Sequence, residues 1–419
     1  MTISAEAIKA VLPKVRSVKN VGRHCFPVLD VSIDDDIRRS YKGGAVQVHP
    51  GREGQTVYDG ASFDVNSMYP WAMLQPMPCG VPIFFEGKYK PDPDYPLYIQ
   101  HILCEFKIKE GYIPTIQIKN NLSYQQNKYL TESVEQTHLY LTSVDLKLFF
   151  DHYDVYNYEY INGWKFQVVY DIFKPYVEYW YEIKKTETGA KRAIAKQMLN
   201  AFYGKTASRV HIKSKIPYMG EDDIVHYKYT EEETKKPVYT AVASFITSYG
   251  RDKILRTAQS LGGTRPDSYF CYMDTDSVHT CNLSVEDAAK YIDIDQTRLG
   301  AFKLEYTCKR AKYIRQKCYI EEQEFTDGTQ TYTNYIRKCA GMPEDVKEWI
   351  SWDAFNLGFE FDPESENLPK DLIHKIASNG VDINNHAAFR HEVERYAKLQ
   401  PVNVPGGVVL KPIRFSIKP

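Results

Sequence analysis

The sequence changes its hydrophobic periodicity near residue 171. Residues 78–170 alternate short aromatic and β-branched segments with Pro, Gly and Asn turns, as in YIQHILCEFKI and GYIPTIQIK, and this pattern predicts strands. From about 171 to 203 the apolar residues recur with helical spacing, with a break near Gly189. Another helix is predicted over 241–261, followed by a strand–turn–strand segment over 268–280. Because the order of elements mixes both classes, we expect an α+β fold.

The remaining segments are compatible with the same fold class. Residues 1–25 form a basic, modestly amphipathic lead-in interrupted by Pro13, and residues 26–60 are rich in loop-forming residues. The segment GASFDV predicts a strand, and Pro70 in the following NSMYP suits the first turn of a helix. Further along, the patterns predict a hairpin within 207–240, strands over 301–342, a helix within 383–399 and final strands in GGVVLKPIRFSI.

Composition restricts the possible classes of function. The formal net charge is −1, so any nucleic-acid-binding surface must be local. The 33 tyrosines are compatible with many half-buried surfaces, and tyrosine also suits contacts with bases and sugars. The eight cysteines form no CxxC pair, which argues against a zinc site and a dense disulfide framework. No apolar run reaches about 18 residues and the N-terminus has no signal-peptide pattern, so we expect a cytoplasmic, reduced protein that does not interact with membranes.

Three carboxylates lie where strands are predicted to end. Asp64 follows the strand-like GASF, whereas Asp274 and Asp276 occupy the turn of the predicted 268–280 hairpin. Strand ends and hairpin tips can present acids to a ligand, and three carboxylates could hold two divalent cations for in-line displacement at phosphorus. Taken singly, Asp64 could instead cap the following helix, and DTD could be a polar turn.

A second group of residues shares one face of a predicted helix. At about 100° per residue, Arg192, Lys196, Asn200 and Tyr203 fall at roughly 0°, 40°, 80° and 20°. Lys184 precedes the break at Gly189 and could reach the same space from a neighbouring helix. Cations, an amide and an aromatic ring on one stripe suit a triphosphate whose base stacks on the tyrosine. A solvated basic face is the alternative, but it leaves Asn200 and Tyr203 unexplained.

A third group is the basic segment 303–319, which carries six cations against one acid and has three interleaved tyrosines. If the segment is a strand from Tyr313 onward, then Tyr313, Arg315, Lys317 and Tyr319 share one face. That pattern suits contact with a sugar–phosphate backbone. A cationic edge strand that resists aggregation is the alternative.

Six motifs in this order resemble those of the family B DNA polymerases, and specifically their protein-primed phage branch. DVNSMYP (64–70), KQMLNAFYG (196–204) and YMDTDS (272–277) are similar to motifs A, B and C of that family. The shorter motifs YKGG (41–44), TSYGR (247–251) and KCY (317–319) resemble its Tyr-x-Gly-Gly, Thr-x-x-Gly-Arg and Lys-x-Tyr elements. The resemblance implies a right-hand polymerase with an antiparallel palm sheet, helical fingers, a small β-rich thumb and two insertions.

The resemblance implies roles for individual residues at a nucleotide site. Asp64 and Asp276 would bind two Mg²⁺ ions, with Mn²⁺ as an alternative, assisted by the Val65 carbonyl and with Asp274 beside them. Tyr69 would press on the sugar of the incoming dNTP and exclude a 2′-hydroxyl. The other nucleotide contacts would be Lys184, Arg192 and Lys196 on the triphosphate, Asn66 and Ser67 near its tail, and Asn200 and Tyr203 at the nascent base pair.

The resemblance also implies contacts with template–primer DNA. Tyr41, Gly43 and Gly44 would bind the template, and Lys317 and Tyr319 would hold the primer strand. The remaining implied DNA contacts are Gly204, Lys205, Thr247, Arg251 and Lys338. At initiation a side-chain hydroxyl of a terminal protein would replace the primer 3′-hydroxyl. The chain is expected to act as a monomer.

The resemblance implies a division of the chain into seven regions. These are a lead-in (1–40), an N-terminal palm segment (41–77), a first insertion that binds terminal protein (78–172), fingers (173–206), a second insertion for processivity and strand displacement (207–240), a C-terminal palm segment (241–342), and a thumb (343–419) with an extra helical segment near 360–400.

Two departures from the family pattern bear on function. Only 63 residues precede Asp64 and they contain no Asp-x-Glu pair, so we expect no proofreading exonuclease, and strand displacement stays open. Ala201 replaces the usual serine of motif B, which we expect to be a mild change. Two other functions remain alternatives: a non-catalytic module that binds DNA or terminal protein, and a metal-dependent nuclease.

Overall fold

The computed structural model describes residues 25–118, 128–219, 221, 225–327, 330–340, 347–348, 350–359, 375–381, 388–393, 397–404, 407–414 and 417. Most of the predicted lead-in therefore lies outside the described residues. The chain divides into two compact units. The first contains the described residues of 1–51, 59–210 and 236–307, and the second contains those of 52–58, 211–235 and 308–419.

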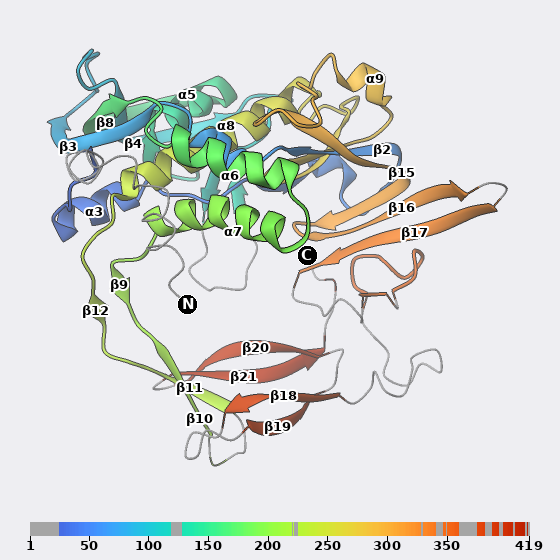
Figure 1. The fold of residues 1–419 in the computed structure, drawn as a ribbon. Coiled ribbons are helices and arrows are strands. Elements are labelled where there is room, and N and C mark those ends of the chain that lie inside the picture. Colours follow the sequence, from blue (N-terminus) through green and yellow to red (C-terminus); the bar gives the residue numbers. More distant parts are fainter. Residues whose placement is uncertain are drawn as a thin grey trace. The chain divides into compact units, whose positions relative to one another are not determined.

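The first unit contains β1, β13, β14, β2 and the beginning of β15, which lie in this order in one sheet. Figure 1 labels β2 and β15. The bounds are β1 Val46–Val48, β2 Thr56–Val65, β13 Phe270–Asp274, β14 Ser277–Thr280 and β15 Phe302–Arg315. Phe63, Met273 and Val278 are completely buried, and they pack in one cluster with Ile254 and Leu255 of helix α8 (Thr240–Ser260). This apolar face fixes which side of the sheet α8 covers. The predicted α+β class, the 241–261 helix and the 268–280 hairpin are confirmed.

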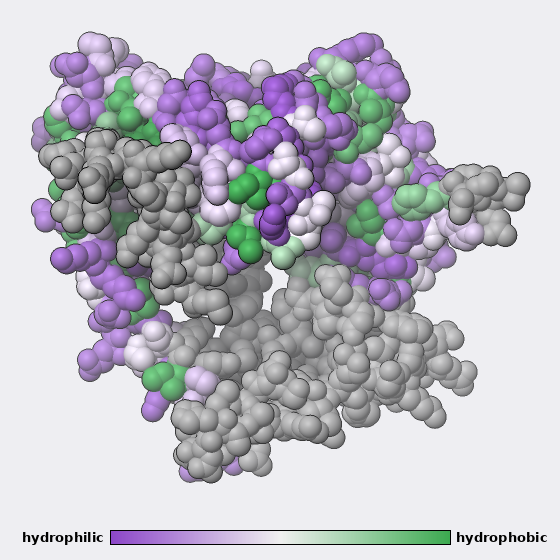
Figure 2. Space-filling model, viewed as in Figure 1, coloured by the Kyte–Doolittle hydropathy of each residue, from purple (hydrophilic) through white to green (hydrophobic). Residues whose placement is uncertain are grey.

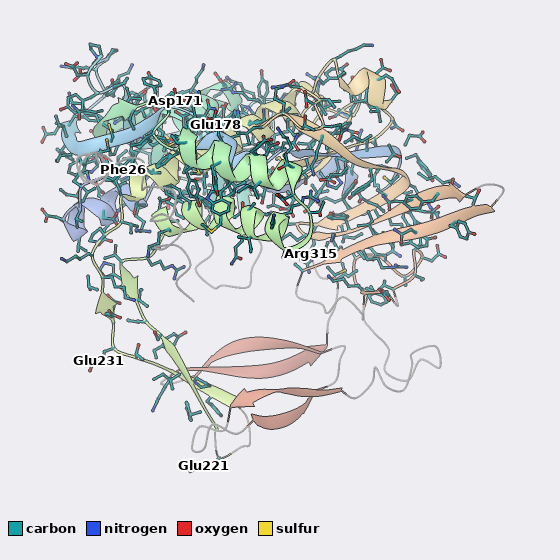
Figure 3. All side chains as sticks on the ribbon, viewed as in Figure 1. Phe26, Asp171, Glu178, Glu221, Glu231 and Arg315 are labelled. Carbon is teal, nitrogen blue, oxygen red and sulfur yellow. The ribbon has the colours of Figure 1, made fainter. Side chains whose placement is uncertain are left out.

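Two neighbouring helices, α6 (Lys174–Thr186) and α7 (Gly189–Thr206), follow one another with only two residues between them. Gly189 has a φ of +57°, a left-handed conformation that glycine adopts without steric cost. The predicted break at Gly189 is therefore confirmed. Phe26, labelled in Figure 3, stacks on Phe173 just before α6, with ring centroids 5.7 Å apart.

A second sheet of the first unit has the order β3-β8-β4-β7. One helix, α5 (Ser143–His152), interrupts the strand-rich region and was not predicted from the sequence. Thr142 caps it, because its Oγ1 accepts a hydrogen bond from the Asp145 backbone N–H at 3.2 Å. The apolar face of α5 packs against the sheet through Leu146 and Phe149. The strands are β3 Met77–Glu86, β4 Leu97–Ile108, β5 Ile116–Ile118, β6 Lys128–Leu130, β7 Thr137–Thr142 and β8 Tyr153–Val169.

Short helices complete the regular structure around these sheets. In the 26–60 segment, which was expected to be rich in loops, α3 spans Val31–Arg38. Pro70 lies in the first turn of α4 (Met68–Ala72), as predicted. The others are α9 (Val285–Ala288) and the 3₁₀ helix η1 (Pro50–Arg52). Of the helices in the described ranges, none is long and apolar enough to cross a membrane. The coloured residues in Figure 2 are mostly hydrophilic, with scattered small hydrophobic groups among them.

The second unit is mostly strands. A four-stranded sheet has the order β10-β11-β21-β20, and the β10–β11 pair confirms the hairpin predicted within 207–240. The helix predicted within 383–399 and the helical segment near 360–400 are wrong for the residues described, because 375–381, 388–393 and 397–404 are strands. The bounds are β9 His211–Ile212, β10 Lys215–Met219, β11 Val225–Tyr229, β12 Glu233–Thr234, β16 Cys318–Asp327, β17 Gln330–Cys339, β18 Lys375–Val381, β19 Ala388–Val393, β20 Ala397–Val404 and β21 Gly407–Arg414.

The chain turns back within the basic segment of the second unit. β15 ends at Arg315 (Figure 3), Lys317 has a φ of +56°, and β16 begins at Cys318. The continuous strand predicted from Tyr313 to Tyr319 is therefore wrong. Tyr313 and Tyr319 instead lie opposite one another across the turn, with ring centroids 5.6 Å apart. All eight cysteines lie in described ranges, and none of them is in a disulfide there.

Candidate active site

Strand pairing brings Asp64 and Asp276 together. Asp64 is the penultimate residue of β2 and lies opposite Ser277 of β14. The Val65 N–H donates to the Asp276 carbonyl at 2.8 Å, which fixes the turn between β13 and β14 against the end of β2. Both aspartates line one cavity, as does Val65. Asp274 is held by other groups, because its carboxylate accepts hydrogen bonds from the hydroxyls of Tyr272 and Thr275, each at 3.1 Å.

This cavity has a volume of about 490 Å³ and lies within the first unit. Cationic side chains of α6 and α7 line one side of it, and the carboxylates of β2 and of the β13–β14 turn line another. The cavity brings together nine of the predicted residues: Asp64, Val65, Ser67, Tyr69, Lys184, Arg192, Lys196, Asn200 and Asp276. The helical stripe predicted for Arg192, Lys196 and Asn200 thus faces the two acids.

Electrostatics in the cavity suit a divalent cation. Burial, followed by the nearby charge of Asp276, raises the pKa of Asp64 from 3.8 to about 7, although Lys303 and Lys184 oppose this. Two carboxylates so close repel one another unless a cation lies between them. No cluster of three or more His, Cys, Asp or Glu side chains suited to a metal occurs among the described residues. If Asp64, Asp276 and the Val65 carbonyl held a divalent cation, water and phosphate oxygens could fill its remaining positions, an all-oxygen set that suits Mg²⁺.

The residues predicted near the triphosphate differ in their surroundings. Burial, followed by repulsion from Lys303 and Lys196, lowers the pKa of Lys184, and its Nζ donates to Ser67 Oγ at 2.7 Å. Ser67 has a φ of +51° and lines the cavity. Asn66 is buried, and its side chain donates to the Asp295 carbonyl at 2.9 Å, so it holds a neighbouring loop.

Three tyrosines connect the cavity to the YKGG loop. The Tyr69 ring stacks on Tyr203 with centroids 4.4 Å apart, and the hydroxyls of Tyr203 and Tyr41 are hydrogen-bonded at 2.7 Å. Burial raises the pKa of Tyr69 to about 12, so its hydroxyl is neutral. Tyr69 lines the cavity, which is where a group that senses the sugar must lie.

The YKGG loop lies against the turn that carries the acids. A Cβ on Gly44 would lie 2.8 Å from Thr275 Cγ2, whereas one on Gly43 would meet nothing within 4 Å. The Thr275 N–H donates to the Ala45 carbonyl at 2.7 Å. Only glycine therefore allows the loop to approach the turn so closely at position 44.

Arg251, predicted to contact DNA, is only 5% exposed and lies in the interior. Its Nε and Nη2 donate to the carboxylate of Asp145 at 3.1 and 2.6 Å. Its Nη1 donates to the carbonyls of Lys42 and Gly43 at 2.7 and 2.8 Å. The guanidinium group of Arg251 therefore holds the backbone of the YKGG loop, and the buried carboxylate of Asp145 fixes the orientation of that group.

The other predicted DNA contacts divide into buried and exposed residues. Thr247 is buried, and its hydroxyl donates to the carbonyls of α8. Gly204 and Lys205 are exposed at the end of α7. In the second unit Lys317 and Lys338 are exposed, whereas Tyr319 is 8% exposed and lies opposite Lys338 in the β16–β17 ladder.

Sequence reasoning missed three charged residues of the first unit: Asp145, which binds Arg251, and Lys303 and Glu305, which line the cavity. Asp145 could have been found from its position three residues after Thr142, which is a helix-capping pattern. Lys303 and Glu305 line the cavity from β15, and their spacing of two places them on one face of that strand. No local signal showed that this face points to Asp64, because strand order is a long-range property.

Comparison with known proteins identifies the family. The family model described as DNA polymerase type B, organellar and viral, matches residues 1–294. The DNA polymerase of Bacillus phage phi29 is 38% identical over 430 residues, which cover all of this chain and 68% of the phage protein. The DNA polymerase of Streptococcus phage Cp-1 is 36% identical over 374 residues, which cover 86% of this chain and 63% of that protein.

A solved structure agrees with the sequence comparison. Phi29 DNA polymerase in complex with primer–template DNA and incoming nucleotide superimposes with a TM-score of 0.79 at 37% identity, covering 99% of this chain and 67% of that one. The resemblance predicted from six motifs, and the polymerase fold that it implied, are therefore confirmed. The chain belongs to the type B DNA polymerases of organelles and viruses.

Proposed function

We propose that the cavity between Asp64, Asp276 and the cations of α7 adds dNMP to a primer 3′-hydroxyl in a template-directed reaction. The observation that carries this proposal is the convergence of the two acids with Lys184, Arg192 and Lys196 in one cavity of a family B polymerase. Asp64, Asp276 and the Val65 carbonyl would hold two Mg²⁺ ions, with Mn²⁺ as an alternative. When bound, the ions lower the pKa of the attacking hydroxyl and neutralise the leaving pyrophosphate.

The cations of α6 and α7 bind and orient the triphosphate. Arg192 and Lys196 are one helical turn apart and both line the cavity, so they can contact successive phosphates. Lys184 reaches the same space while its Nζ is held by Ser67. The stacked Tyr69 and Tyr203 form a rigid wall, against which the sugar and the nascent base pair would pack. A 2′-hydroxyl would collide with Tyr69.

A second set of residues binds DNA in this proposal. The YKGG loop contacts the template, Lys317 and Tyr319 contact the primer strand, and Lys338 is a further DNA contact. Support comes from the relatedness to phi29 DNA polymerase, whose structure was determined with primer–template DNA and nucleotides. The first insertion would bind a terminal protein whose hydroxyl starts synthesis. The phage origin of the relatives supports action in the cytoplasm of a bacterial host. The chain would act as a monomer.

Primer extension with Asp276→Asn tests the proposal. The amide keeps the shape of the turn but is a poor metal ligand, so incorporation should fall at least about 10³-fold, which corresponds to a few kcal/mol of transition-state stabilisation. Asp287→Asn, at an exposed carboxylate of α9, is the matched control and should extend primers normally. Extension by Asp276→Asn at the wild-type rate would contradict the metal assignment. End-labelled DNA incubated without dNTPs would reveal the nuclease alternative.

A further inference from the structure

Lys303 brings a cation to the carboxylate side of the cavity. It is the second residue of β15, and the neighbour of β15 in the sheet is β2, which carries Asp64. Its Nζ lies 3.8 Å from Asp64 Oδ1 and also forms an ion pair with Glu305. The side chains of Lys303 and Asp64 are each 28% exposed, so water screens their attraction only in part.

Lys303 has a different position from the cations that suit the triphosphate. Those extend from α6 and α7, and Lys184 is hydrogen-bonded to Ser67. Lys303 and Glu305 extend from one face of the same strand, two residues apart. Because the ammonium group already contacts both carboxylates, a small rotation of the lysine side chain is enough to favour Asp64 or Glu305.

We propose that Lys303 and Glu305 act as a counter-ion switch that sets the affinity of the Asp64–Asp276 pair for divalent cations. Without a cation, the ammonium group of Lys303 offsets the repulsion between the two acids. When a divalent cation occupies the pair, Lys303 moves wholly to Glu305, because like charges repel at this distance. The inference rests on the metal site of the proposed function.

Substitutions of Lys303 and Glu305 should change the affinity for Mn²⁺ in opposite directions. Lys303→Gln removes the competitor and should tighten Mn²⁺ binding about tenfold, which corresponds to about 1.4 kcal/mol. Glu305→Gln leaves Asp64 as the nearby carboxylate for Lys303 and should weaken Mn²⁺ binding about five-fold, or about 1 kcal/mol. In a Lys303→Gln background, Glu305→Gln should have little further effect, because the glutamate acts through the lysine.

The experiment measures Mn²⁺ binding to the full 419-residue chain without nucleotide, from the loss of the free-ion electron paramagnetic resonance signal. Lys303→Arg keeps the charge and should bind Mn²⁺ like the wild type, which separates charge from packing. Lys290→Gln removes a lysine from an exposed ion pair with Asp287 and should also leave Mn²⁺ binding unchanged. Circular dichroism of each variant checks that the fold is retained.

Two results would overturn the switch. One is a Lys303→Gln protein that binds Mn²⁺ no more tightly than the wild type. The other is a Glu305→Gln effect of full size in the Lys303→Gln background, which would make Glu305 a direct ligand. Asp276→Asn separates this failure from that of the proposed function. If Asp276→Asn abolishes Mn²⁺ binding while Lys303→Gln changes nothing, only the switch is wrong; if Asp276→Asn binds like the wild type, the metal site itself is wrong.

Discussion

Asp64 should lower the stability of the metal-free protein, and Asp64→Asn should restore that stability. The folded state raises the pKa of this carboxyl from 3.8 to about 7, so the folded chain holds a proton that the unfolded chain has released. Stability is therefore lost as the pH rises from about 4 to about 7, and the full cost applies above that window. At 1.36 kcal/mol per pKa unit the cost is about 4 kcal/mol. Because water partly screens the side chain, about 1–3 kcal/mol is the expected effect.

Thermal or urea unfolding in the presence of EDTA measures this effect. At about pH 8, Asp64→Asn should be more stable than the wild type by about 1–3 kcal/mol, and near pH 4 the two should be equal. Adding Mg²⁺ should narrow the difference at high pH, because only the wild type retains its full set of ligands and is stabilised by the ion. The same variant should lack polymerase activity, because substitutions that stabilise a protein at a functional site commonly reduce its activity.

A matched control separates the effect of this site from a general effect of charge. The Lys290 hydrogen bond lowers the pKa of exposed Asp287, so Asp287→Asn should give no gain of stability at high pH. The reasoning would be refuted if Asp64→Asn were no more stable than the wild type at about pH 8 in EDTA. An equal gain at about pH 4 would also refute it, since both chains then carry a neutral side chain at position 64.

Three further substitutions test other features of the site. Tyr69→Val removes the ring that stacks on Tyr203 and should relax discrimination between dNTPs and rNTPs by on the order of 10–100-fold in kcat/KM, measured in single-nucleotide incorporation. Gly44→Ala should weaken template–primer binding in a gel-shift assay more than Gly43→Ala does, because a Cβ at position 44 would lie 2.8 Å from Thr275 Cγ2, whereas one at position 43 meets nothing within 4 Å. Arg251→Ala leaves the Asp145 carboxylate buried without its partner and should cost about 3–5 kcal/mol in urea unfolding; an exposed DNA contact at this position would instead change DNA affinity and leave stability unaltered.

Local patterns predicted those features of the site that depend on a single element. The stripe of Arg192, Lys196 and Asn200 follows from helical spacing alone, and all three residues line the cavity. The roles of Lys303 and Glu305 depend on β15 lying beside β2, two strands that are distant in sequence, so no local pattern contained them. Family resemblance predicted that Arg251 contacts DNA. In the structure Arg251 is buried against the carboxylate of Asp145, which lies more than a hundred residues away in the sequence.

The errors in the predicted fold have similar physical causes. The polar and apolar spacing within 383–399 favours a helix, but pairing of β18 with β19 and of β20 with β21 overrides this local preference. The turn before Cys318 was missed because IRQKC contains no Gly, Asn or Pro, and Lys317 itself adopts the left-handed conformation. Helix α5 was missed because it lies in a region where the flanking segments are all strands.

The pairing of Asp145 with Arg251 limits how this enzyme could be rearranged during evolution or in the laboratory. Asp145 lies within the predicted first insertion, yet it holds the arginine that fixes the YKGG loop of the predicted palm. A chimera that replaces residues 78–172 must therefore supply a carboxylate at the same place, or the loop loses its anchor. Residues 78–172 and the YKGG loop would therefore be inherited together, as a single unit of exchange.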